Sequence, residues 1–201
     1  MHSGGPYRHA VPGSDARRAA DERRPSDIVR PIADLELIRV PGDRRRYELR
    51  GAGTLRLEAS FSRSAAAEAG DQHWQIVRRP ERRRIVRRGD LIVVIQATDP
   101  SGVVAGEFHG RARVRGGKLR WGERDLELRS SSRWRPRYAL VDGELELAAI
   151  EGKGWGKRPV KLTTYDGAAA EPGLLLLAAF VVGALTGDAQ RNAGAAITAG
   201  K

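Results

Sequence analysis

Arginine dominates the side chains of this sequence that can do chemistry, and it is most concentrated between residues 78 and 88. Seven arginines share this run with a single glutamate: Arg78, Arg79, Arg82, Arg83, Arg84, Arg87 and Arg88. A guanidinium offers N–H donors in a planar fork that matches phosphate and carboxylate groups. The run therefore predicts a site for a phosphate-rich partner, either anionic lipid head groups or nucleic acid. The alternative is a solvated strand face whose charges discourage strand-edge association.

A second basic group interleaves arginine with aromatic residues. It contains Arg133, Trp134, Arg135, Arg137 and Tyr138. Aromatic rings can stack on nucleic-acid bases while the neighbouring arginines neutralise phosphates. We therefore consider two functions. The first is a module that binds anionic lipid head groups or another acidic partner, such as an acidic protein surface, and the alternative is a nucleic-acid-binding β-barrel.

The other residue types that support catalysis do not form a recognisable set. The chain has no cysteine, which excludes thiolate nucleophiles, thiolate metal sites and disulfides. The four histidines, His2, His9, His73 and His109, show no metal-ligand spacing. The stretch 152–158, rich in glycine and lysine, lacks the glycine and hydroxyl positions of a phosphate-binding loop. We expect a non-enzymatic protein with no metal and no cofactor.

Composition is consistent with one basic domain. The 201 residues carry 36 lysine and arginine side chains against 25 acidic ones, which gives a net charge of +11. Apolar residues make up 40% of the chain, which is enough for a core. Arginine far outnumbers lysine, and a GC-rich coding sequence is a second explanation for that bias. Residues 1–30 hold no apolar run typical of an export signal, so we expect a cytoplasmic protein, peripheral at the inner membrane surface if it binds lipid.

The elements that must position these residues are mainly strands. From residue 34 onward, apolar and charged residues alternate, as in strands that are buried on one face. Turn-forming residues separate the runs, and tight hairpins are predicted at Gly116-Gly117 and at Asp142-Gly143. The alanine-rich stretch 65–69 is predicted to be a loop rather than a helix. About a dozen short strands at this spacing predict an antiparallel barrel or sandwich.

Residues 174–185 break the alternation because none of them has a polar side chain. Their length and their Leu and Ala content favour a helix, yet about 18 Å of helix is too short to span the roughly 30 Å core of a bilayer. A helix that is apolar all round must be covered all round, and a closed barrel does this. We therefore predict a mainly β fold, a closed antiparallel barrel of about twelve strands around one buried C-terminal helix. Eight leucines are predicted to point inward: Leu35, Leu37, Leu55, Leu57, Leu126, Leu128, Leu145 and Leu147.

The predicted domain covers residues 28–187, between a flexible arm (1–27) and a flexible tail (188–201). Within it, residues 137–145, Ile150, residues 158–160 and the helix 174–185 are similar in layout to a known family. Many short strands before one apolar helix resemble the tubby C-terminal-like fold of tubby, the LURP-one-related proteins and the phospholipid scramblases. The resemblance implies a twelve-stranded barrel around a central helix, a mostly non-enzymatic role and, as in tubby, binding of phosphoinositide head groups.

The sequence also departs from the pattern of this family. The helix ends with Gly183-Ala184-Leu185-Thr186, where the family often has acidic or amide side chains. The sequence has neither an acidic cluster suited to calcium nor a cysteine run suited to palmitoylation. The resemblance therefore does not imply scramblase activity.

Overall fold

The computed structural model describes residue 1 and residues 31–58, 63–80, 92–111, 116–132, 136–152, 160–165 and 170–198. The described elements are twelve strands and one helix. In chain order they are β1 (Pro31–Arg39), β2 (Arg46–Leu49), β3 (Gly53–Leu57), β4 (Ser64–Ala69), β5 (Gln72–Pro80), β6 (Ile92–Thr98), β7 (Val104–Arg111), β8 (Gly116–Trp121), β9 (Arg124–Ser130), β10 (Arg137–Asp142), β11 (Leu145–Glu151), β12 (Val160–Tyr165) and α1 (Pro172–Thr198).

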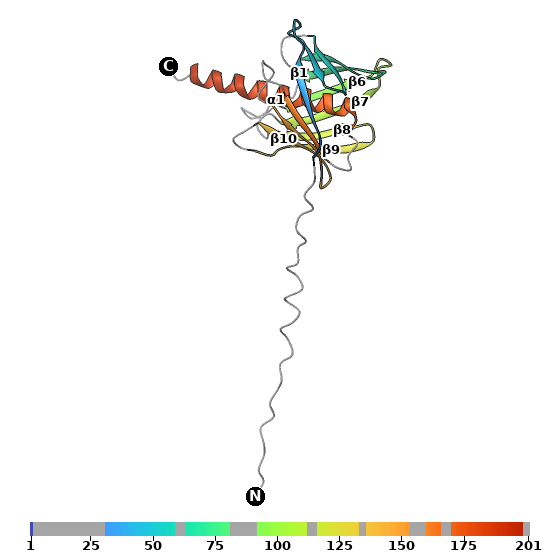
Figure 1. Cartoon of the computed structure of the whole chain (residues 1–201). Helices are drawn as coiled ribbons and strands as arrows, with labels where there is room; N and C mark the ends of the chain where they lie inside the picture. Colours follow the sequence, from blue (N-terminus) through green and yellow to red (C-terminus); the bar gives the residue numbers. More distant parts are fainter. Residues whose placement is uncertain are drawn as a thin grey trace.

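The strands form one closed antiparallel barrel, which confirms the predicted fold class (Figure 1). Each strand pairs with the next one along the chain, and β1 closes the barrel by pairing with both β2 and β12. Closure leaves no unpaired sheet edge. Every strand therefore has one face toward the interior and one face outside.

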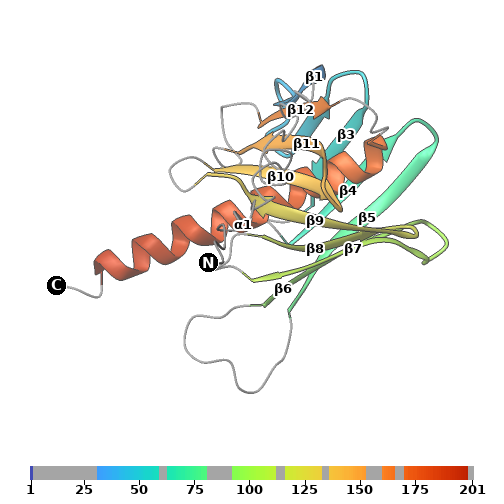
Figure 2. The same cartoon turned by 90° about the horizontal axis from the view of Figure 1, so that it is seen from below.

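Helix α1 occupies the interior of the barrel, as predicted, but it is longer than expected. It begins at Pro172, and residues 173–186 are buried. The expected stop after Leu185 is wrong, because the helix continues to Thr198 and projects from the barrel (Figure 2). Thr186 does not end the helix, since its hydroxyl donates to the carbonyls of Val182 (2.8 Å) and Gly183 (3.1 Å) in the preceding turn.

Six of the eight leucines predicted to face inward are buried: Leu37, Leu55, Leu57, Leu126, Leu128 and Leu147. Leu35 is partly buried and packs against the same core. The prediction for Leu145 is wrong, because this side chain is 42% exposed. Leu145 is the first residue of β11 and pairs with Asp142 beside the connecting turn, so it lies beyond the part of the strand that covers the helix.

Two local predictions in the first part of the barrel are also wrong. Residues 65–69 belong to β4, not to a loop, because Ala65, Ala67 and Ala69 alternate into the core. Gly116 and Gly117 do not form a turn but lie within β8, where Gly117 pairs with Gly110. A Cβ on Gly117 would lie 2.2 Å from the carbonyl oxygen of His109, so glycine permits the close approach of these strands.

The hairpin between β10 and β11 is confirmed, with its turn one residue later than predicted. Asp142 pairs with Leu145, which leaves Gly143 and Glu144 as the two turn residues. Gly143 has a φ of 59°, in the left-handed region that glycine adopts without steric cost. This turn and the others on the same side join the strands near the start of α1.

Candidate functional site

The barrel has two chemically different ends. At the tryptophan end, where α1 begins, the strands are joined by two to five residues. At the arginine end, from which α1 leaves, the connections have four to eleven residues. Two close approaches show the direction of the helix. Gly173, at the start of α1, lies so near the ring of Trp74 that a Cβ there would collide with it. Val182, farther along α1, lies similarly near Gly152, which follows β11 at the arginine end.

At the arginine end, arginines lie at or directly beside the ends of neighbouring strands, two residues beyond a buried inward-facing residue. We call these residues, Arg39, Arg45, Arg63 and Arg78, the arginine rim. Arg39 pairs with Tyr47 across β1 and β2, and the backbone N–H of Arg78 donates to the carbonyl of Arg63 at 2.7 Å. Arg39, Arg45 and Arg63 are exposed, while Arg78 is half-buried.

The burial of Tyr47 shows where the core stops and the arginine rim begins. Tyr47 is 4% exposed, and burial raises the pKa of its phenol, while the positive charge of Arg39 acts in the opposite direction. Arg45 lies beside the end of β3, where its carbonyl accepts from the N–H of Leu57 at 2.8 Å. The arginine rim therefore caps the apolar interior along the β1–β5 side.

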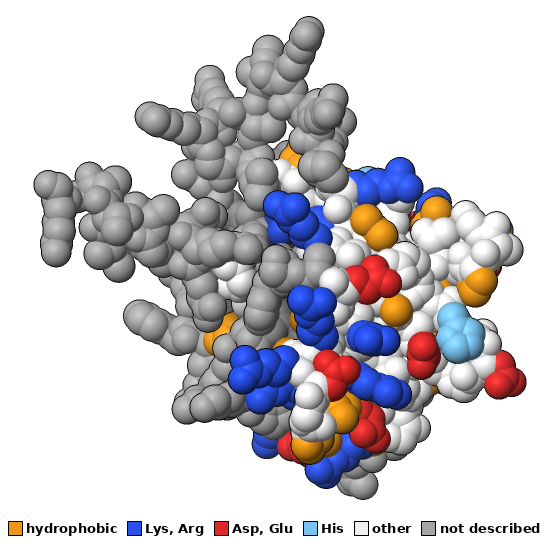
Figure 3. All heavy atoms as spheres, turned by 90° about the horizontal axis from the view of Figure 1, so that it is seen from above, with side chains coloured by type: hydrophobic (Ala, Val, Ile, Leu, Met, Phe, Trp, Pro, Cys, Tyr) orange, Lys and Arg blue, Asp and Glu red, His pale blue; other side chains and the backbone are white. Residues whose placement is uncertain are grey.

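Three more arginines extend this charge onto the outer wall. Arg46 on β2 lies directly opposite Arg56 on β3, and Arg79 lies on β5. All three are exposed. Figure 3 looks onto this side of the barrel. It shows Lys and Arg side chains between the middle of the visible face and the residues drawn in grey. We call Arg46, Arg56 and Arg79 the flank arginines.

Within the described part of the chain, none of Arg39, Arg46, Arg56, Arg63 and Arg79 forms an ion pair. The nearby carboxylates have other partners. Asp43 accepts from the backbone N–H of Arg45 at 2.9 Å, and Glu58 accepts from the side-chain amide of Gln75. These five arginines therefore present positive charge to the surroundings.

The tryptophan end carries mainly carboxylates, and four of them, Glu68, Asp99, Asp142 and Glu171, make internal contacts. Asp142 pairs with Arg124 at 2.8 Å, and Glu171 accepts from the indole N–H of Trp121 at 2.7 Å. Asp99 accepts from the hydroxyl of Ser101 and from backbone N–H groups of its own turn, which together lower the pKa of this carboxyl. The carboxylates of this end are Glu68, Asp71, Asp99, Glu123, Asp125, Asp142, Glu144 and Glu171.

The first predicted arginine cluster is only partly within the described residues. Arg78 belongs to the arginine rim and Arg79 to the flank arginines. The other members, Arg82, Arg83, Arg84, Arg87 and Arg88, lie outside the described residues. The sequence search overlooked Arg39, Arg45 and Arg63, because they are scattered in the chain and only the closure of the barrel brings them to one end.

The second predicted patch is divided. Arg133, Trp134 and Arg135 lie outside the described residues. Arg137 is exposed and lies 3.9 Å from Glu151, on the opposite wall of the barrel from Arg78. Tyr138 is 2% exposed, so the prediction that it offers a stacking surface is wrong: it occupies an inward position of β10 and fills the core.

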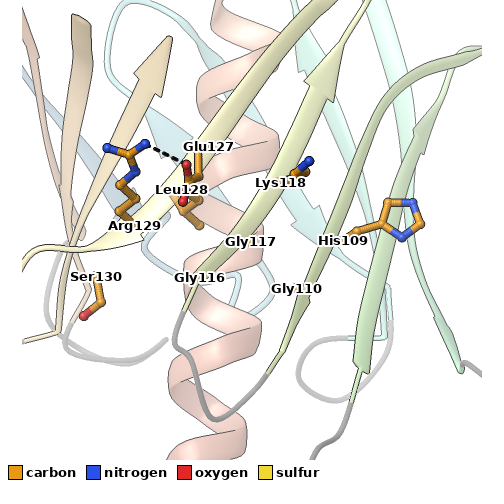
Figure 4. A pocket seen from close by; sticks show the side chains of 9 residues that line it. All are labelled: His109, Gly110, Gly116, Gly117, Lys118, Glu127, Leu128, Arg129 and Ser130. Atoms are coloured by element: carbon orange, nitrogen blue, oxygen red, sulfur yellow. Dashed lines mark hydrogen bonds and ion pairs between the residues drawn. The ribbon is translucent and has the colours of Figure 1, made fainter. Parts of the chain in front are cut away.

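A groove of about 530 Å³ lies on the outer wall over β7, β8 and β9 (Figure 4). Its floor has little side-chain cover, because Gly110, Gly116 and Gly117 meet there. Charged side chains lie around this floor: His109 pairs with Lys118 across β7 and β8, and Lys118 pairs with Glu127 across β8 and β9. The groove lining also includes Leu128, Arg129 and Ser130.

Internal contacts hold the two carboxylates beside this groove in the ionised form. Arg129 donates to Glu127 at 2.8 Å, and this hydrogen bond, with the charges of Arg129 and Lys118, lowers the pKa of Glu127. Burial raises the pKa of Glu107, but hydrogen bonds from His109 and Gln96 and nearby positive charge outweigh it and leave that pKa below its usual range. His109 Nε2 lies 3.0 Å from Glu107.

Comparisons with protein-family models, curated proteins and solved structures found no match to this chain. Of the helices among the described residues, none is long and apolar enough to cross a membrane. The same residues contain no group of three or more histidine or carboxylate side chains placed to hold a metal ion.

Proposed function

We propose that this protein is a non-catalytic binding module that engages anionic lipid head groups, or another acidic partner, through the arginine rim and the flank arginines. The observation that carries this proposal is the separation of charge between the two ends of the barrel. At the tryptophan end, carboxylates such as Asp142 and Glu171 are used within the fold. At the arginine end, Arg39, Arg46, Arg56, Arg63 and Arg79 are exposed and form no ion pair among the described residues.

A binding role suits the interior of this barrel better than catalysis. Helix α1 fills the space in which other barrels hold a ligand, and residues 174–182 are at most 2% exposed. A partner can therefore contact only the outer surface, where exposed charged side chains and the groove are available. Clustered guanidinium groups attract phosphates and raise the rate of association with an anionic surface.

The projecting part of α1 constrains how a flat membrane can approach. Residues 187–198 extend the helix by about 18 Å beyond its buried part. That distance exceeds the screening length of about 8 Å at physiological salt, so a membrane that met the helix tip head-on would not feel the arginine rim. We therefore propose a tilted approach in which the β1–β5 side faces the head groups.

Lipid is favoured over nucleic acid by the position of the aromatic residues. Binding of single-stranded nucleic acid relies on exposed rings that stack on bases. Tyr138 is buried, and neither the arginine rim nor the flank arginines include an aromatic residue. The resemblance in layout to tubby-like proteins also supports binding of lipid head groups.

The test is co-sedimentation of the protein with vesicles that contain anionic lipid and with neutral vesicles. A triple variant, Arg46→Gln, Arg56→Gln and Arg63→Gln, removes three charges from the arginine end. A matched variant, Arg50→Gln, Arg120→Gln and Lys161→Gln, removes the same charge elsewhere. Each basic residue near an anionic membrane contributes about 1 kcal/mol, so we expect the first variant to lose about tenfold or more in binding and the second to lose little.

Two results would contradict the proposal. Equal losses in both variants would mean that only the total charge matters. Release of the protein from vesicles by a low stoichiometry of DNA, with no preference among anionic lipids, would support nucleic-acid binding instead.

A further inference from the structure

We propose that the groove over β7, β8 and β9 is a separate binding site for a small phosphorylated molecule, such as a sugar phosphate. The groove volume of about 530 Å³ lies within the range of about 300–1,000 Å³ that is usual for small-molecule sites. This proposal does not depend on membrane binding, because the groove lies on other strands than the arginine rim and the flank arginines.

The groove arises from glycines at the ends of two neighbouring strands. Gly110 pairs with Gly117, and Gly116, the first residue of β8, pairs with Arg111 beside them. A Cβ on Gly116 would lie 2.4 Å from the carbonyl oxygen of Leu128, so no larger residue fits without a shift of the backbone. At these three positions glycine lets the neighbouring strands approach closely, and the charged side chains beside them form the walls of the groove.

Lys118 provides the first positive charge for a phosphate. Its side chain is exposed, and among the described residues it forms no ion pair. Figure 4 shows Lys118 on the middle strand, between His109 on one side and Glu127 with Arg129 on the other. An ammonium group in this position can bind a phosphate oxygen as a point charge.

Arg129 provides the second positive charge, and Glu127 holds it in place. One terminal nitrogen of Arg129 donates to Glu127, which leaves the remaining N–H groups of the guanidinium for a ligand. Lys118 and Arg129 lie on neighbouring strands, because the partner of Lys118 in the register is Glu127, two residues before Arg129. Diagonal neighbours of this kind are about 7–8 Å apart at Cα, a span that two long side chains close around one phosphate.

The rest of the lining favours a ligand that carries hydroxyl groups beside its phosphate. Glu127 stays ionised and accepts hydrogen bonds, and the hydroxyl of Ser130 donates to the carbonyl of Ser132, which leaves its oxygen free to accept. Leu128 adds little apolar surface, since it is fully buried. A phosphate with hydroxyl donors beside it matches this combination of two cations and two acceptors.

The experiment is a titration of the full ¹⁵N-labelled chain, followed by amide chemical shifts, with three probes: a hexose 6-phosphate, inorganic phosphate and the unphosphorylated hexose. We expect saturable shifts at Gly116, Gly117 and Arg129 with the hexose phosphate, weaker ones with inorganic phosphate and none with the hexose. Lys118→Met should weaken binding about tenfold. Arg120→Gln, which removes the same charge two residues along β8, should leave the affinity unchanged.

Other outcomes would overturn the proposal. Shifts that grow without saturation, or an equal loss of affinity in Arg120→Gln and Lys118→Met, would show only general attraction of anions to a basic surface. The triple variant at the arginine end should bind the hexose phosphate normally. This variant therefore distinguishes a failure of the proposed phosphate site in the groove from a failure of the proposed membrane binding.

Discussion

The two ends of the barrel use charge in opposite ways. At the tryptophan end, carboxylates bond to neighbouring turns and to Trp121, and the rings of Trp74 and Trp121 lie 5.6 Å apart beside the start of α1. At the arginine end, the exposed arginines make few internal contacts among the described residues. A compositional bias toward arginine would affect both ends equally. The difference therefore supports our proposal that one end closes the fold and the other binds a partner.

The helix that connects the two ends should produce the largest effect on stability. Leu176 is fully buried, so Leu176→Asp places an unpaired charge in a closed apolar interior. We expect the variant to lose about 4 kcal/mol or more of unfolding free energy, which leaves the barrel largely unfolded at 37 °C. Thermal unfolding followed by circular dichroism measures the loss.

Leu145→Asp is the matched control for this substitution. Leu145 is 42% exposed at the tryptophan end, and the same change there should cost less than about 0.5 kcal/mol. A Leu176→Asp protein that melts like the parent and only loses membrane association would mean that α1 is an anchor and not the core of the barrel.

Substitutions that open the tryptophan end should have the second largest effect on stability. Trp121 is 6% exposed and packs against Trp74, so Trp121→Ala leaves a cavity and should lower the unfolding free energy by about 3–5 kcal/mol. Glu171→Gln retains an oxygen that accepts from the indole N–H, and it should cost about 1 kcal/mol. Urea unfolding of both variants gives the comparison. Equal losses would show that the ionised carboxylate, and not the packing of the rings, holds this end closed.

Much of the fold follows from the sequence because it depends on local patterns. Period-two alternation reports which face of each strand is buried, and the twelve apolar residues of the helix require cover on every side. The predictions fail where the structure of a segment depends on contacts with other parts of the chain. Residues 65–69 are predicted to form a loop, but Ala65, Ala67 and Ala69 are small enough to pack in the core around α1, and the segment pairs with its neighbours as β4.

The candidate binding surface is harder to predict, because it depends on closure of the barrel. The run 78–88 is visible in the sequence, whereas Arg39, Arg45 and Arg63 become neighbours only when β1 to β5 lie side by side. The arginines around Tyr138 in the chain predict an exposed ring, but its position on β10 places the ring in the core. Assigning the parity of every strand end would have identified both features.

A substitution on the outer wall should have only a small effect on stability but tests the difference between the two ends most directly. Arg46 and Arg56 are directly opposite each other on the outer wall, and like charges in this position destabilise a strand pair. Arg56→Glu converts the repulsion into an ion pair, which should raise the unfolding free energy by about 0.2–1 kcal/mol. The same substitution should weaken binding to anionic vesicles. Arg120→Glu, on the outer wall of β8, is the control for the change in charge. If Arg56→Glu leaves vesicle binding intact, the flank arginines do not take part in binding. A variant that is more stable yet binds vesicles less would show that the protein keeps the repulsion between Arg46 and Arg56 because both charges contribute to binding.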